Sequence, residues 1–108
     1  MIAIIANPSI KNANDTVTVN PVTGVKTITA TAAAVFAGAS VLANRKKLIL
    51  RNEDPAIRFR VGPAAVTQQN GLPVEPGASL EITFDPATAI SIYAISEGAA
   101  VAVQVTEL

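Results

Sequence analysis

The sequence predicts an all-β fold: a small antiparallel β-sandwich or a jelly-roll-like barrel, with an extended N-terminal segment. Short runs alternate between apolar and polar residues, which is the period of a strand with one buried face. Turn-forming residues separate these runs about every 8–12 positions, as in sandwiches and barrels. The length of 108 residues fits one domain with its own core.

The first 30 residues contain two runs rich in β-branched residues, "DTVTVN" and "VKTITA", joined by "NPVTG". This pattern predicts a hairpin. An isolated two-stranded hairpin is marginally stable in water, so these strands must pair with something else. We therefore expect residues 1–30 to form an N-terminal arm or hairpin, which either reaches a neighbouring subunit or joins the sandwich edge. Residues 31–108 are expected to form the β-sandwich domain.

The Ala-rich segment 29–47 is ambiguous between helix and extended chain. Alanine favours helix, but Gly38 and Ser40 interrupt the segment. It also lacks an acidic first turn and an apolar stripe with a period of 3.6 residues. We expect extended chain with a bend at Gly38.

Five strand-like runs follow, and they are "KKLILRN", "AIRFRV", "SLEITF", "AISIYAIS" and "VAVQV". Three of them alternate strictly, whereas "KKLILRN" and "AISIYAIS" are more continuously apolar, as expected for strands covered on both sides. Aromatic residues make up only 4% of the chain, so aliphatic side chains must supply most of the core. The expected core includes Phe59, Leu80, Ile82, Phe84 and Ile92.

The stretch "VGPAAVTQQNGLPVEPGAS" is rich in Gly and Pro, as are some phosphate-binding loops. Such loops lead from a strand into a helix N-terminus, whereas this one leads from strand to strand. Its prolines also lack the N–H group that donates to an anion. Asn70-Gly71 and Pro76-Gly77 suit turns that require a positive φ. A structural connection is therefore favoured over a ligand loop.

The composition excludes most catalytic and metal chemistry. The chain has no His and no Cys, which removes the commonest general base, the commonest metal ligand and thiol chemistry. The serines lack a histidine to activate them, and no pair of carboxylates stands out as glycosidase-like. Glu53 and Asp54 have oxygens suited to Ca²⁺, but a tight turn before Pro55 explains the same residues and is favoured. We expect no enzyme, no catalytic residue, no cofactor, no metal site and no small-molecule substrate.

Charge is scarce and unevenly placed. A net charge of zero argues against generic binding to nucleic acid or membranes. Only 15% of residues are charged, which suggests either a partner-covered surface or a neutral one. Six of the eight basic residues lie within 16 positions: Arg45, Lys46, Lys47, Arg51, Arg58 and Arg60. They form a candidate subunit interface that meets an acidic surface. The alternative is pairing within one sheet, with Arg58 and Arg60 near Glu81.

The opening residues "MIAIIANPSI" have no basic region and too short an apolar run for a signal peptide. No stretch approaches the length of a membrane-spanning helix. We therefore expect a protein that is made in a cytoplasm and stays there until it is assembled or released.

The segment from "RKKLILRN" through "I-x-F-x-VG" and "NG-x-P…PG-x-S-L-E-I" to "IYAIS" resembles small β-proteins encoded among the virion genes of tailed bacteriophages. The resemblance covers about residues 39–105. It implies a non-enzymatic role on the capsid surface, as a decoration (cement) or head-fibre protein, or else a tail component. It implies the major capsid protein and copies of the chain itself as partners. A homotrimer is expected because decoration proteins often sit at capsid three-fold positions. The alternative is a tail or fibre module that binds a host receptor or glycan, although Tyr93 is the only Tyr and Trp is absent.

Overall fold

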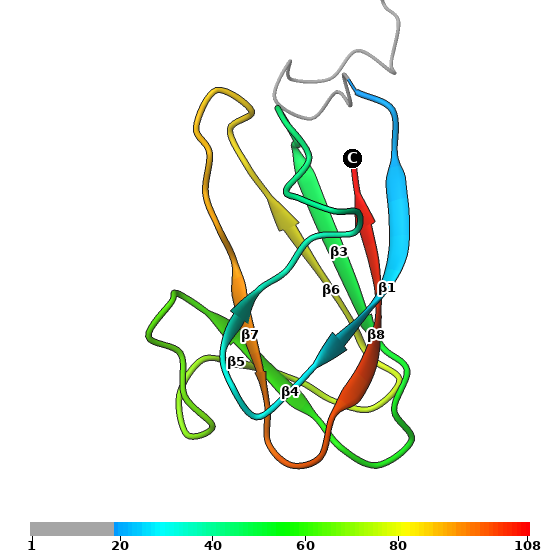
Figure 1. Ribbon diagram of the computed structural model, residues 1–108, viewed down its shortest axis with the longest axis vertical. Coiled ribbons are helices and arrows are strands. Elements are labelled where there is room, and N and C mark those ends of the chain that lie inside the picture. Colours follow the sequence, from blue (N-terminus) through cyan, green and yellow to red (C-terminus); the bar gives the residue numbers. More distant parts are fainter. Residues whose placement is uncertain (1–18) are drawn as a thin grey trace, which may run out of the picture.

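The computed structural model describes residues 19–108 as eight strands and no helix, which confirms the all-β prediction (Figure 1). The strands are β1 (Val22–Ile28), β2 (Ala33–Ala34), β3 (Lys47–Asn52), β4 (Phe59–Gly62), β5 (Leu72–Val74), β6 (Ser79–Thr83), β7 (Tyr93–Ser96) and β8 (Val101–Glu107). Residues 1–18, which hold most of the run "DTVTVN", lie outside this described part.

The strands form two four-stranded antiparallel sheets, in the orders β1-β8-β3-β6 and β2-β7-β4-β5. The pairs β1·β8, β2·β7, β3·β6 and β4·β5 are those of one long hairpin ribbon. Folding this ribbon on itself adds the contacts β3·β8 and β4·β7. This order is that of the eight-stranded jelly roll.

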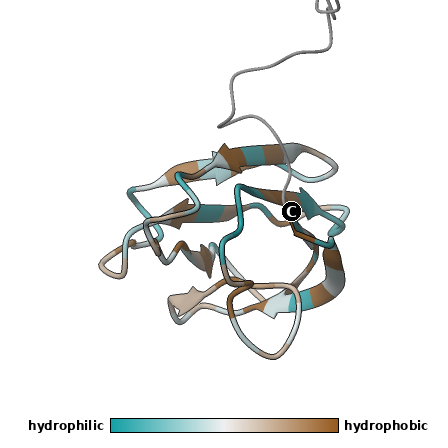
Figure 2. Cartoon of the chain, turned by 90° about the horizontal axis from the view of Figure 1, so that it is seen from above, coloured by the Kyte–Doolittle hydropathy of each residue, from teal (hydrophilic) through white to brown (hydrophobic). Residues whose placement is uncertain are grey.

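The core lies between the two sheets and is mostly aliphatic. Alternate residues of β8, Val101, Val103 and Val105, face inward and are buried. Figure 2 shows the same alternation of apolar and polar positions along other strands. The predicted core is confirmed for Phe59 and Phe84, which are buried. The other members of that prediction pack half-buried against the core, and they are Leu80, Ile82 and Ile92.

The hairpin connection expected at "NPVTG" is wrong. Strand β1 already begins at Val22 and pairs with β8 without interruption, from Val22 opposite Glu107 to Ile28 opposite Val101. A complete ladder of backbone hydrogen bonds overrides the local turn signal. Gly24 serves a close approach instead, because a Cβ there would collide with the carbonyl oxygen of Ala37.

The Ala-rich segment is extended, as expected. Residues Ala33–Ala34 form β2, and the Val35 N–H donates to the Ile92 carbonyl at 2.8 Å. The chain then bends through residues 37–40, around Gly38.

The expected turns are confirmed at Gly71 and Gly77, whose φ angles are 95° and 79°. At the acidic turn, Asp54 Oδ1 accepts the N–H groups of Ala56 and Ile57 at 3.0 and 3.2 Å. This carboxylate therefore shapes a tight turn.

Candidate functional site

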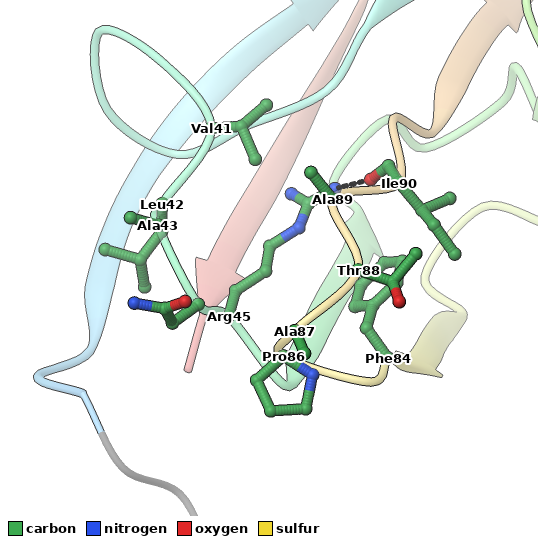
Figure 3. A pocket seen from close by; sticks show the side chains of 11 residues that line it. Val41, Leu42, Ala43, Arg45, Phe84, Pro86, Ala87, Thr88, Ala89 and Ile90 are labelled. Atoms are coloured by element: carbon green, nitrogen blue, oxygen red, sulfur yellow. Dashed lines mark hydrogen bonds between the residues drawn. The ribbon is translucent and has the colours of Figure 1, made fainter.

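A groove opens at one end of the sandwich, between the loops formed by residues 41–45 and 84–90 (Figure 3). Its volume is about 330 Å³. Arg45 lies between the two loops, and its guanidinium points toward Ile90. The walls are mostly apolar and include Val41, Leu42, Phe84, Pro86 and Ile90.

A buried ion pair fixes the first of these loops. Arg45 Nη1 lies 2.7 Å from Glu107 Oε2, and the two side chains are only 4% and 0% exposed. The Glu107 carboxylate also accepts the backbone N–H groups of Ala37 at 2.9 Å and Leu42 at 3.0 Å. One carboxylate thus joins the end of β8 to two separate points of the segment that follows β2.

The guanidinium of Arg45 ties in the second loop. It donates to the carbonyl oxygens of Ile90 at 3.0 Å and Val35 at 3.4 Å. It also lies over the Phe84 ring, 4.6 Å from its centroid, a distance at which the cation is attracted by the ring. The groove is therefore held open by a hydrogen-bonded charge pair beneath it.

Glu107 was not singled out from the sequence. The signal was present in the alternation, because Val101, Val103 and Val105 face inward and Glu107 is the next position on that face. A carboxylate on a buried face requires a cationic or N–H partner. The partner, Arg45, lies far away in the sequence.

A second cluster of charges, defined here as the Glu97 cluster, lies beside β4 and β7. Glu97 Oε2 accepts from Arg58 Nε at 2.7 Å and from Arg60 Nε at 2.6 Å. Arg58 Nη1 also donates to Glu75 at 3.2 Å. Partial burial acts to raise the pKa of Glu97, but the hydrogen bonds from the two arginines outweigh it and the pKa is lowered. The hydrogen bond to Glu97, and then that to Glu75, raises the pKa of Arg58.

The expected pairing of Arg58 and Arg60 with Glu81 is wrong. Both arginines flank Phe59 at β4, whereas Glu81 lies on β6 in the other sheet. Glu81 instead meets Lys47 of the adjacent β3 at 3.3 Å. The sequence did not reveal that β4 lies between β5 and β7.

The six basic residues singled out in the sequence are divided between both sheets and the buried end of the sandwich. Arg45 and Lys46 are buried. Arg51 pairs with Glu53 at 3.0 Å, and both side chains are exposed. Contacts with a carboxylate of this same chain are made by Arg45, Lys47, Arg51, Arg58 and Arg60.

Within residues 19–108, no group of three or more acidic side chains is placed to hold a metal ion. No stretch of that described part forms a helix with the length and apolar content of a membrane span. No family model, curated protein or solved structure matches the chain.

Proposed function

We propose that this chain is a non-enzymatic structural protein of a bacteriophage virion, which binds the capsid surface as a decoration or head-fibre protein. The observation that carries the proposal is the strand order, β1-β8-β3-β6 against β2-β7-β4-β5. Jelly rolls of this kind recur in viral capsid and lectin domains.

Fold alone does not determine function, so a second, independent line of support is needed. It comes from the resemblance of residues 39–105 to phage virion proteins. In this structure that stretch supplies β3 to β7 and most of β8. Several of its charged side chains pair with one another, and Asn52 and Asp54 bind backbone groups. This use of polar groups agrees with a structural role.

We propose the major capsid protein and further copies of the chain, as a homotrimer, for its partners. Because Arg45 and Lys46 are buried, such a contact would be made by the exposed members of the basic strip, the name used here for the six basic residues between positions 45 and 60. Arg51 is the most suitable of these, since 55% of its side chain is exposed. Light scattering, which measures the mass of the particle in solution, would test the trimer. A protein that stays monomeric both free in solution and when bound to capsids would contradict it.

The proposed attachment is tested with labelled protein and with heads, tails and host cells of the phage that encodes it. The heads should come from particles made without this protein. We expect co-sedimentation with heads. Binding to host cells or tails without binding to heads would replace the proposal by a receptor-binding or glycan-binding module.

A matched pair of variants tests the basic strip. Arg51→Ala removes one positive charge from it, and Ala65→Glu makes the same change in net charge on an exposed loop of the other sheet. Weaker head binding or self-association of Arg51→Ala alone would assign the contact to the strip. Equal behaviour of the two variants would remove Arg51 from the interface.

A further inference from the structure

The groove between residues 41–45 and 84–90 is apolar and uncovered within the described part of the chain. Ile90 at its rim is 47% exposed. The volume of about 330 Å³ is roughly twice the ~150 Å³ that suffices to bind a benzene molecule. It can therefore hold two or three aliphatic side chains.

We propose that residues 1–6 of the same chain, "MIAIIA", occupy this groove. All six residues are apolar, and Ile2, Ile4 and Ile5 are of a size that fits the space. This inference goes beyond the proposed virion role and does not depend on it.

The chemistry of the groove selects an apolar occupant. The guanidinium of Arg45 already donates to Glu107, Val35 and Ile90. Both oxygens of the Glu107 carboxylate accept hydrogen bonds from within the chain. The charged groups beneath the groove are thus satisfied, and what it offers a ligand is mainly its aliphatic and aromatic walls.

The path of the chain favours its own N-terminal segment over that of a second copy. Val22 lies opposite Glu107 in the β1·β8 ladder, and Glu107 binds the N–H of Leu42 on the groove wall. The described chain thus begins close to the groove. A linker of the length of residues 7–18 reaches about 20 Å on average as a random coil and at most about 40 Å when fully extended. When a linker is about as long as the distance it must cross, it keeps the attached segment at a high effective concentration near its binding site. This favours binding of the N-terminal segment within its own chain.

Disulfide trapping tests the proposal in the full chain, which has no native cysteine. Ile4→Cys is combined with Ala89→Cys on the groove wall. Ile4→Cys with Leu72→Cys is the control, because Leu72 is exposed on β5 and does not line the groove. On mild oxidation we expect the Ala89 pair to close within the monomer on the order of ten times faster than the control pair. Equal closure rates would overturn the proposal.

Mixing two single-cysteine chains identifies whose segment is bound. In the mixture, an Ile4→Cys chain can form a disulfide only with an Ala89→Cys chain, which gives a covalent dimer. If this dimer forms faster than the disulfide closes within the double variant, a second copy is the occupant and the proposal is wrong. Adding Ile5→Asp to the trapping pair should slow closure toward the control rate, and an unchanged rate would contradict apolar docking. Far-UV circular dichroism confirms that each variant keeps its sheet, and Thr88→Cys replaces Ala89→Cys if that variant does not fold.

Discussion

Glu107→Gln is expected to destabilise this protein far more than the loss of one surface charge would. The carboxylate is fully buried and accepts three hydrogen bonds, from Arg45, Ala37 and Leu42. Glutamine keeps one acceptor oxygen and places an NH₂ group against the remaining donors. The guanidinium of Arg45 then loses its counter-charge while it stays buried.

Removing one partner of a buried ion pair costs about 3–5 kcal/mol, because the other charge is left uncompensated. Typical domains have a total stability of only about 5–15 kcal/mol. A loss of about 3 kcal/mol lowers Tm by more than ~10 °C in a domain of this size. The assay is urea denaturation followed by circular dichroism, with the m-value checked for two-state behaviour.

The matched control is Glu81→Gln, which removes the exposed pair with Lys47 in the same sheet. Exposed pairs contribute about 0–1 kcal/mol, so this variant should be nearly neutral. In the double variant Arg45→Met with Glu107→Gln, the loss should be smaller than the sum of the single losses by about 0.5–3 kcal/mol. If Glu107→Gln cost no more than Glu81→Gln, the structural importance assigned to the pair would be refuted.

Three further outcomes follow from the packing and the Glu97 cluster. Phe59→Ala should cost about 3–5 kcal/mol, because the ring is fully buried, whereas Leu72→Ala on the exposed edge should stay within about 0.5 kcal/mol in the same urea titration. Gly24→Ala should lower the free energy of unfolding by about 1–3 kcal/mol, because the added Cβ collides with a backbone carbonyl. Gly38→Ala should cost less, because a Cβ makes only ordinary contact there. The reverse order of urea midpoints would contradict the close approach of Gly24 to Ala37. The lowered pKa of Glu97 predicts stability that is complete above its ordinary value of 4.5 and is lost as pH falls through the lower folded value. Urea midpoints measured over that acidic range should show a weaker pH dependence in Glu97→Gln than in the parent, and identical profiles would argue against the cluster.

The sequence was most informative where structure depends on neighbours along the chain. Alternation correctly identified the inward face of β8 and the burial of Phe59, because a strand turns successive side chains to opposite faces. The turns at Gly71 and Gly77 were predictable for a similar reason, since a positive φ is a local demand met by glycine.

Prediction failed where the answer depends on which distant strand becomes a neighbour. The turn expected at "NPVTG" was replaced by the β1·β8 ladder, whose far strand is the last one described. The burial of Glu107 was not predicted because Arg45, which neutralises it, is remote in sequence. The groove escaped notice for the same reason, since two loops separated by several strands build it.

The position of β8 also has a consequence for biosynthesis. This strand is the last along the described chain, yet it lies between β1 and β3 and pairs with both. During translation β1 must therefore wait for β8 before its sheet can close, because β2 to β7 all leave the ribosome before this ladder partner does. Contacts of such long sequence separation slow folding and leave strand edges open in the meantime. A nascent chain that stalls before β8 would expose the edges of β1 and β3 together, so we expect it to depend on chaperones until the last strand is released.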